Sequence, residues 1–554
     1  MCLQDDGLDP SHYVSAPGMF NDSLYKSSKV EIKLMSDMDD YLTVENGIRG
    51  GMTMVSHRYA KANNEKCPDY DPNKPKSWIM YEDMNALYSG AMTQYLPTEI
   101  LGKVTPEEIP DIQRIAPDAE IGYILEADLD VPGHLHDFFA DYPLAPEKQI
   151  VPENWLSLYN ERLVRDKEVG GGKYVSGEKL LQTLLPKKNY VIHYRALQLY
   201  MKYGLKITKI HGALKFRQSP WMKAYIEENI RKRKIAKANK DEFGVMYYKL
   251  KNNAVFGKQM ENVRKHMRVE ILRSDQDKKL TRLVSSPLFV GFKAFEGGIT
   301  AVHMLKSTVT LNKPIFVGQA ILDISKAMMY NFWYGYIKPR YGDKARLLYT
   351  DTDSLIMWIE TEDIYKDRAE RPDIFDLDYS GDLFLMKDET KGDPIGEAVC
   401  LKPKMYSVLP AGHDPNTPKT DADFEKELED EETRKSQGIK DWQKKHGMQK
   451  AKGVKKCVVK RELRHDKFLK CLETQKLTRH DMYGLRSYDH QIYLERVNKI
   501  GLNPYDNKRW ILLNGIRTLP YGHWRIYAYK RMVSSGMSPE EAEKRAMMVK
   551  LKAR

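Results

Sequence analysis

The sequence predicts an α+β fold in which long helices pack on an antiparallel sheet. In residues 346–359 (RLLYTDTDSLIMWI), β-favouring residues stand on both sides of a short turn, which predicts a hairpin. Residues 77–81 (SWIMY) predict a further strand, whereas residues 220–239 and 312–338 have the length and spacing of helices.

The first predicted strand and helix are neighbours in the sequence. The strand at 77–81 ends at Glu82 and Asp83, and residues 85–92 are expected to begin a helix. A carboxylate is therefore expected at the junction of these two elements.

Two longer helices follow. Residues 220–239 (PWMKAYIEENIRKRKIAKAN) predict a cationic helix with proline at its start. Within 312–338, three apolar residues recur at helical spacing, so this helix is expected to pack beneath a sheet. These three residues are Ile321, Ile324 and Met328.

The predicted hairpin carries Asp351 and Asp353 at its tip. The apolar residues 355–359 are expected to anchor the hairpin in the core and so hold the carboxylates rigidly. Taken alone, this Asp-x-Asp pair is better explained by a turn, because aspartate is common in turns. The pair indicates a metal site only together with other segments.

Composition is that of a globular protein with a basic surface. The 554 residues, 42% of them hydrophobic, suffice for several domains or one multi-lobed enzyme. The net charge of +12 suits a polyanionic partner, and an ordinary basic protein is the alternative. The five cysteines form no CxxC pair, which argues against a zinc ribbon or a secreted disulfide scaffold. We find no signal peptide or membrane span, and expect an intracellular protein of undetermined compartment without a membrane partner.

Charge changes sharply in the last third of the chain. Residues 421–432 (DADFEKELEDEE) are almost wholly acidic and indicate a solvated linker or helix face. Residues 434–470 are strongly basic and are expected to line a groove for a polyanion. The expected contacts are Lys452, Lys455 and Lys456. A domain boundary is predicted near residue 412.

Three segments together indicate a two-metal phosphoryl transfer site: 81–90 (YEDMNALYSG), 249–257 (KLKNNAVFG) and 349–354 (YTDTDS). In such sites, carboxylates from separate strands hold two Mg²⁺ ions about 3.5–4 Å apart. Mg²⁺ typically uses few carboxylates, while water and substrate phosphates complete its shell. Asp83 and Asp353 are the predicted bridging ligands, and Mn²⁺ is the expected substitute ion.

The middle segment supplies positive charge. On a helix, Lys249 would meet nucleotide phosphates, and Asn253 and Gly257 follow on nearly the same face. Gly257 would let a base pair approach closely. Taken singly, these residues are explained as a solvated lysine, a capping asparagine and a helix-ending glycine. Only the three segments together, in this order, favour nucleotide binding.

The motifs resemble those of family B DNA polymerases, specifically the protein-primed viral, organellar, plasmid and Polinton-like branch. DMNALY (83–88) resembles DxxSLYP, KLKNNAVFG resembles KxxxNSxYG, YTDTDS resembles YxDTDS, and KMY (404–406) resembles KxY. The likeness extends over roughly residues 7–525. It implies a right-hand fold with a palm of antiparallel sheet plus helices, helical fingers, a thumb and two insertions.

The resemblance implies a role for each matching residue. Asp83 and Asp353 would ligate the catalytic metals with Asp351 as a nearby contributor, Lys249 would contact the triphosphate, and Tyr88 would be the steric gate against a ribose 2′-hydroxyl. The other implied nucleotide contacts are Asn253, Phe256, Gly257 and Lys237, the last being as readily a solvated lysine. The implied DNA contacts are Gly50, Gly51, Thr352, Lys404 and Tyr406, of which Lys404 and Tyr406 would hold the primer strand.

This chain departs from the family pattern at four positions. Ala86 and Ala254 stand where the family usually has serine, Ser89 where it has proline, and Phe256 where it has tyrosine. None of these changes removes a metal ligand. Because Phe256 keeps an aromatic stacking surface, we expect altered fidelity or pairing geometry and not inactivation.

Residues 48–51 (IRGG) resemble the YxGG segment that joins exonuclease and polymerase modules in relatives, with its tyrosine replaced. The 47 preceding residues contain no acidic motifs arranged like those of a 3′–5′ exonuclease. We therefore expect a chain that does not proofread, through truncation, an incomplete sequence or a separately encoded module.

The resemblance divides the chain into seven parts. They are 1–99 (N-terminal segment and start of the palm), 100–185 (an insertion that docks a priming protein), 186–220 (palm), 221–261 (fingers), 262–312 (a second insertion that helps encircle DNA), 313–412 (palm) and 413–554 (thumb). The alternative for both insertions is family-variable surface decoration.

The predicted activity is template-directed DNA synthesis by two-metal nucleotidyl transfer from dNTPs to a primer 3′ end, in the replication of a viral or mobile element. The expected partners are primer-template DNA, dNTPs and a priming protein. An inactive DNA-binding remnant of a mobile-element polymerase is the alternative. A reverse transcriptase is disfavoured, because its YxDD motif has adjacent aspartates and Thr352 separates them here.

Overall fold

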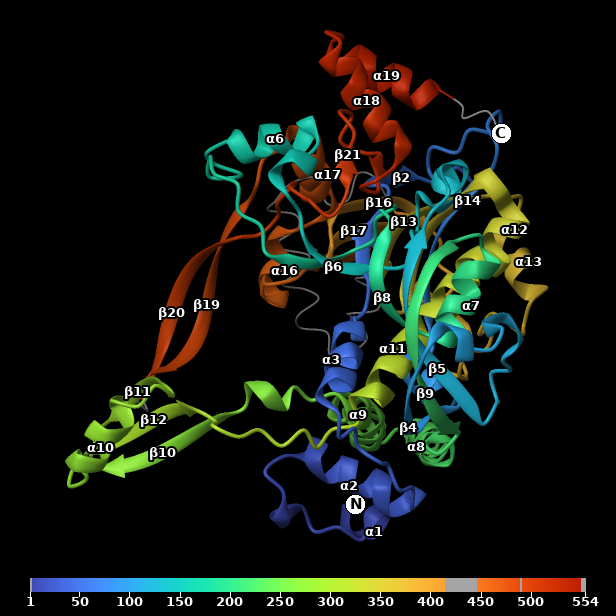
Figure 1. Cartoon of the computed structure of the whole chain (residues 1–554). Coiled ribbons are helices and arrows are strands. Elements are labelled where there is room, and N and C mark those ends of the chain that lie inside the picture. Colours follow the sequence, from blue (N-terminus) through green and yellow to red (C-terminus); the bar gives the residue numbers. More distant parts are fainter. Residues whose placement is uncertain (1, 414–445, 489–490, 550–554) are drawn as a thin grey trace.

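The computed structural model describes residues 2–413, 446–488 and 491–549 (Figure 1). The predicted acidic run at 421–432 and the first part of the predicted basic stretch, 434–445, lie outside these residues. Helices and antiparallel sheets are mixed along the described chain, which confirms the predicted α+β class. None of its helices combines the length and the apolar character needed to cross a membrane.

A central antiparallel sheet organises the molecule, with nine strands from the described residues. Its path is β1 (Thr53–Val55), β13 (Ala345–Asp351), β14 (Ser354–Glu360), β3 (Ser77–Met84), β16 (Ile395–Lys402), β17 (Met405–Pro410) and β18 (Met448–Ala451). Two short strands attach to it, β2 (Tyr59–Lys61) to β16 and β15 (Met386–Asp388) to β3. Sequence-distant segments thus meet at its centre.

The predicted hairpin is confirmed as β13 and β14. Leu355, Ile356, Met357 and Ile359 are at most 1% exposed, so the apolar run does anchor the hairpin in the core. β14 also pairs with β3, with Ser354 opposite Asp83. This register places the hairpin tip beside the end of β3.

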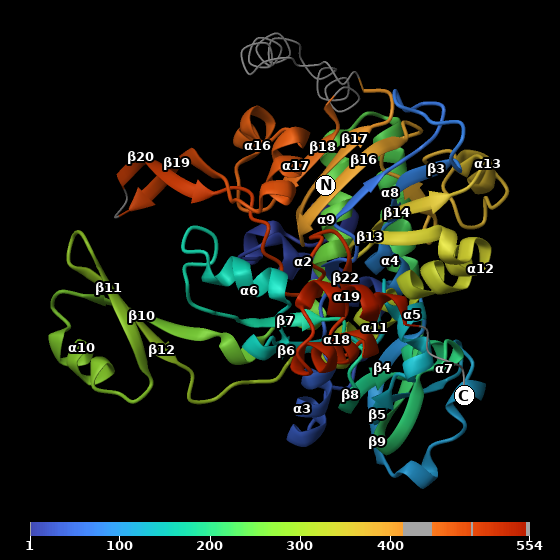
Figure 2. The ribbon, with the colours of Figure 1, turned by 90° about the horizontal axis from the view of Figure 1, so that it is seen from above.

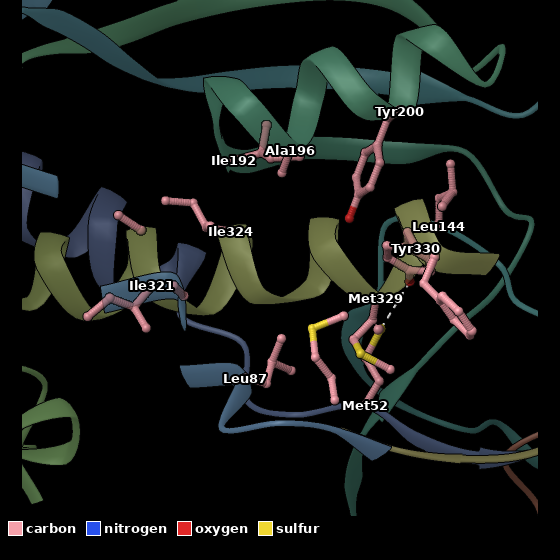
Figure 3. Packing of buried hydrophobic residues seen from close by; sticks show 14 of the residues in the cluster. Met52, Leu87, Leu144, Ile192, Ala196, Tyr200, Ile321, Ile324, Met329 and Tyr330 are labelled. Carbon is pink, nitrogen blue, oxygen red and sulfur yellow. Dashed lines mark hydrogen bonds between the residues drawn. The ribbon is translucent and has the colours of Figure 1, made fainter. Parts of the chain in front are cut away.

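A second sheet has the order β4 (Leu96–Val104), β9 (Lys206–Ser219), β5 (Ile121–Asp130) and β8 (Lys187–His193). The buried helix α11 (Ile315–Phe332) contacts β4 and β8, as predicted for a helix beneath a sheet. Figure 3 shows Ile321 and Ile324 of α11 among the apolar side chains of this core. Buried residues of α11 and of both sheets belong to one hydrophobic core.

The predicted cationic helix is α8 (Lys223–Ala238), which packs against α9 (Glu242–Gln259). Two earlier helices, α1 (Cys2–Asp6) and α2 (Ala16–Ser28), lie next to this pair in Figure 1. α3 (Met38–Gly47) follows them and contacts α11 and β8.

Two parts project from the same side of the body (Figures 1 and 2). One is a small sheet of β10 (Met267–Arg273), β12 (Ile299–Leu305) and β11 (Phe289–Phe295), with helix α10 (Asp277–Val284). The other is the hairpin of β19 (Arg479–Tyr488) and β20 (Gln491–Ile500). They approach each other where the Lys293 ammonium lies 5.7 Å from the ring centroid of Tyr488.

The remaining elements cover the sheets or connect these parts. They are α4 (Leu87–Met92), α5 (His136–Phe139), β6 (Glu147–Ile150), α6 (Leu158–Arg165), β7 (Glu178–Leu181), α7 (Tyr194–Lys202), α12 (Lys338–Tyr341), α13 (Ile364–Ala369), α16 (Lys456–Glu462), α17 (His465–Thr474), β21 (Trp510–Ile511), β22 (Thr518–Leu519), α18 (Trp524–Ser534) and α19 (Pro539–Met548). The predicted helix at 85–92 corresponds to α4.

The predicted division at residue 185 runs through the second sheet, since β4 and β5 precede it and β8 and β9 follow it. In contrast, the small sheet lies wholly within the predicted second insertion, 262–312. The seven-part division of the chain stays a prediction.

Candidate active site

The structure brings Asp83 and Asp353 together at one end of the central sheet. The backbone N–H of Met84 donates to the Asp353 carbonyl at 2.7 Å, which ties the end of β3 to the hairpin tip. Burial and the nearby Asp353 carboxylate raise the pKa of Asp83 to about 7. Burial also raises the pKa of Asp353. Two partly buried carboxylates facing the same space are a favourable setting for a cation.

Gly51, one of the two glycines predicted to contact DNA, lies against this tip. Thr352 sits between the two aspartates with a left-handed backbone (φ 64°), and its N–H donates to the Met52 carbonyl at 2.7 Å. A Cβ at Gly51 would lie 2.7 Å from Thr352 Cγ2, whereas one at Gly50 would meet nothing within 4 Å. Only glycine at position 51 therefore allows this tip to pack as it does.

Asp351 is engaged differently from the other two aspartates. Lys404 Nζ donates to both of its carboxylate oxygens, at 2.5 and 2.7 Å. The Tyr349 hydroxyl also donates to it, at 3.3 Å. The predicted metal contributor and the predicted primer contact are thus paired with each other.

The second predicted primer contact, Tyr406, is only 4% exposed. Its hydroxyl lies 2.6 Å from the Tyr81 hydroxyl, and both residues line the same cleft as the aspartates. Tyr406 therefore supports the floor of the cleft.

Sequence reasoning missed Lys387 and Glu389. β15 pairs with β3 so that Lys387 stands opposite Asp83, and its Nζ lies 3.6 Å from Asp83 Oδ1 and 2.5 Å from Glu389 Oε1. Burial opposes the charge on Lys387, but the interactions with Glu389 and Asp83 together outweigh it and raise the pKa of Lys387. No motif marks this three-residue strand, and only the strand pairing identifies it.

Behind the site, Glu82 holds β3 from the other face of the sheet. Its side chain is 1% exposed, and its Oε1 lies 2.8 Å from Nε of Arg368, which is also buried. Burial raises the pKa of Glu82 to about 7, although Arg368 acts in the opposite direction. Successive residues of a strand point to opposite faces, so this pair fixes the residue next to Asp83.

The nucleotide-binding residues predicted on a helix share one exposed face of α9. Lys249, Asn253 and Gly257 are all exposed, and a Cβ at Gly257 would meet nothing within 4 Å. The glycine is thus not required by contacts within the chain, which leaves the space in front of it open to a ligand. Lys237 lies on α8, and its ammonium donates to the Tyr379 carbonyl at 3.4 Å.

The predicted steric gate stacks on the same helix. The rings of Tyr88 and Phe256 lie 4.4 Å apart with an interplanar angle of 14°. Burial raises the pKa of Tyr88 to about 12, and Asp353 adds to this effect. The Phe256 substitution therefore keeps an aromatic surface in contact with Tyr88.

A cleft of about 970 Å³ unites these features. Asp83, Asp351 and Asp353 line it together with Lys404 and a group of lysines from β18, α16 and the turn between them. This group is Lys450, Lys452, Lys456 and Lys460. The predicted contacts Lys452 and Lys456 thus line the same cleft as the aspartates, whereas Lys455 donates to the Tyr483 carbonyl of β19. Within the described ranges, no set of three or more His, Cys, Asp or Glu side chains is arranged to hold a metal by itself.

No protein-family model matches the chain, and no curated protein matches it in sequence. Its fold is similar to that of Phi29 DNA polymerase complexed with primer-template DNA, with a TM-score of 0.46, 15% identity and coverage of 90% of this chain and 69% of that one. An orthorhombic crystal form of Phi29 DNA polymerase gives a TM-score of 0.44 and 15% identity, over 74% of this chain. This chain spans 57% of its length. The family B DNA polymerase of the archaeon Pyrobaculum calidifontis gives a TM-score of 0.26 and 11% identity, over 74% of this chain and 34% of that one.

Proposed function

We propose that this chain is a DNA-directed DNA polymerase that transfers nucleotides from dNTPs to a primer 3′ end. The observation that carries the proposal is the cleft that Asp83 and Asp353 line together with a group of lysines. Acidic residues alone would repel a polyanionic substrate, and lysines alone would bind it without chemistry. Both in one cleft suit phosphoryl transfer on a nucleic acid.

The residues at the tip fit a divalent cation. Asp83 and Asp353 are partly buried carboxylates with raised pKa values, and a hard cation would neutralise their like charges. Mg²⁺ typically needs only a few carboxylates beside substrate and water oxygens. Asp83 and Asp353 would hold it, and Asp351 would join them when Lys404 turns to the primer. Bound Mg²⁺ would supply charge neutralisation at the transferring phosphate.

The other residues would bind and orient the substrates. Lys249 would contact the triphosphate from the exposed face of α9, and Gly257 on the same face would let the new base pair approach. Tyr88, held by its stack on Phe256, would lie under the deoxyribose and exclude a 2′-hydroxyl. Fixed groups of this kind lower the barrier chiefly by positioning and charge stabilisation.

We further infer that α8 and α9 form fingers, the central sheet including β18 a palm, and the elements from α16 onwards a thumb. The approach of the β19–β20 hairpin to the small sheet, at Lys293 and Tyr488, supports the idea that these parts enclose product DNA. Docking of a priming protein on residues 100–185, and a role in the replication of a viral or mobile element, stay predictions of the resemblance.

A primer-extension assay tests the proposal. The purified chain, given a primed DNA template, dNTPs and Mg²⁺, should lengthen the primer by the nucleotides that the template specifies, and EDTA should stop it. An inactive DNA-binding remnant would bind the same DNA without extending it. Binding without extension, under Mg²⁺ or Mn²⁺, would therefore favour that alternative.

A further inference from the structure

Residues 2–28, which form α1 and α2, cover the face of α9 that lies opposite its nucleotide-binding face. Lys249, Asn253 and Gly257 form an exposed ridge with a spacing of four residues. A second ridge with the same spacing is buried, and its members are Tyr247, Lys251, Val255 and Gln259. Because each helical residue turns the side chain by about 100°, ridges offset by two residues point in nearly opposite directions.

A buried ion pair joins this second ridge to α1. Lys251 Nζ lies 2.5 Å from Asp6 Oδ1, and the two side chains are only 2% and 5% exposed. The Ser23 hydroxyl of α2 donates to the same Asp6 oxygen at 2.7 Å, and the Tyr247 hydroxyl lies 3.5 Å from the other oxygen. The Lys251 ammonium also lies 5.3 Å from the ring centroid of Tyr225 on α8. One carboxylate thus connects α1 and α2 to the helix pair.

Further contacts extend along the same side of the pair. The Tyr248 hydroxyl donates to Asp5 at 2.7 Å, and Lys232 of α8 lies 3.4 Å from the other oxygen of Asp5. At the far end of α9, the Gln259 side chain accepts from the Tyr25 hydroxyl at 2.7 Å and donates to Asn21 at 2.9 Å. These contacts span three turns of α9, so residues 2–28 fix its rotation as well as its position.

We propose that residues 2–28 brace α9 and that Asp6 is a positioning residue for the incoming nucleotide, acting through Lys251 and Tyr247. This inference rests on the proposed polymerase function. Removal of the Asp6 charge would leave the Lys251 ammonium buried without its counter-ion, which is strongly unfavourable. α9 would roll or shift to solvate it, and the ridge of Lys249, Asn253 and Gly257 would move with it. The lysines of the cleft do not lie on α9, so DNA binding through them should be unchanged.

Three variants isolate this effect. Asp6→Asn removes the charge. Asp22→Asn is the matched control, because Asp22 is an exposed acid of α2 whose hydrogen bond is to Tyr13 of the same segment. The double variant Asp6→Asn with Lys251→Met removes both members of the pair, which is often tolerated where loss of one member is not.

Three measurements are made: the KM for dNTP, the Kd for primer-template DNA, and backbone hydrogen exchange. In primer extension, Asp6→Asn should raise the KM for dNTP about tenfold. A tenfold change corresponds to about 1.4 kcal/mol, and leaving a buried charge unpaired costs more than that. Its Kd for primer-template DNA should stay within about twofold of wild type, as should both constants of Asp22→Asn, since surface changes are usually small in effect. The double variant should recover most of the loss in KM. Hydrogen exchange of the backbone amides of 249–257 should be faster in Asp6→Asn than in Asp22→Asn.

If Asp6→Asn changes neither the KM for dNTP nor the hydrogen exchange of residues 249–257, the proposal that residues 2–28 position α9 is wrong. A parallel loss of dNTP and DNA binding with no recovery in the double variant would also overturn it, because that pattern indicates general destabilisation. If the wild-type chain makes no DNA, the polymerase proposal fails, while the exchange comparison still decides whether Asp6 braces α9.

Discussion

Gly51→Ala should slow nucleotide transfer by misplacing the hairpin tip. The added Cβ would lie 2.7 Å from Thr352 Cγ2 and 2.9 Å from Thr352 Cβ, whereas ordinary contact begins at 3.4 Å. Rotation of the Thr352 side chain moves Cγ2 but not Cβ, so the tip must shift by at least about 0.5 Å. Thr352 already has a left-handed backbone, which is unusual for a β-branched residue. Because a misplacement of about 1 Å can cost about 100-fold in rate, we expect kcat to fall about 10- to 100-fold.

Single-nucleotide incorporation on primed DNA measures this loss, with DNA affinity measured alongside. Gly50→Ala adds the same methyl group where nothing lies within 4 Å, so its kcat should stay near wild type. Thr352→Gly combined with Gly51→Ala should regain activity relative to Gly51→Ala alone, since it removes the atoms that clash. Equal kcat values for Gly51→Ala and Gly50→Ala would refute the coupling of this glycine to the catalytic tip.

Three further predictions concern the gate, the cleft lysines and a carboxylate remote from the site. Tyr88→Val should raise the ratio of ribonucleotide to deoxyribonucleotide incorporation at least about tenfold, a difference of about 1.4 kcal/mol; an unchanged ratio would reassign Tyr88 to the core. Replacing Lys452 and Lys456 by Gln should lower the slope of log Kd for DNA against log salt by about 2, and an unchanged slope would make them a solvated face. Burial would raise the pKa of Glu397, but the hydrogen bonds from His465 and Tyr59, with the charges of His465 and Lys61, together overcome it and lower the pKa to about 2 from 4.5. This depressed pKa stabilises the fold above about pH 4.5 by about 3 kcal/mol, and the stabilisation is lost as pH falls towards 2. Urea unfolding of Glu397→Gln at pH 6 and pH 3 should therefore show a weaker pH dependence than wild type, and equal dependence would contradict the pairing.

The features of the site that can be predicted from the sequence are those that depend only on the local pattern of residues. The hairpin at 346–359 and the strand ending at Asp83 follow from β-favouring runs and a turn. The exposed ridge of Lys249, Asn253 and Gly257 follows from helical spacing alone. These features needed no knowledge of how the strands pair.

The missed features depend on tertiary pairing. Lys387 meets Asp83 because a three-residue strand attaches to β3, and Asp6 meets Lys251 across 245 positions of sequence. Neither contact has a periodic signal, and both lysines are indistinguishable in the sequence from solvated ones. The sequence likewise gives no sign that Lys404 pairs with Asp351, although the motifs predict a role for each of them, as a primer contact and a metal contributor.

The rate of single-nucleotide incorporation by Asp353→Asn tests the central claim most directly. Asp343→Asn is the matched control, because Asp343 is an exposed acid just before the other end of the same hairpin. We expect Asp353→Asn to bind primer-template DNA normally and to lose at least about a thousandfold in rate, because metal-held charge stabilisation is worth several kcal/mol. Asp343→Asn should keep the wild-type rate. Incorporation by Asp353→Asn at a rate near that of Asp343→Asn would contradict the assignment of this cleft as a polymerase active site.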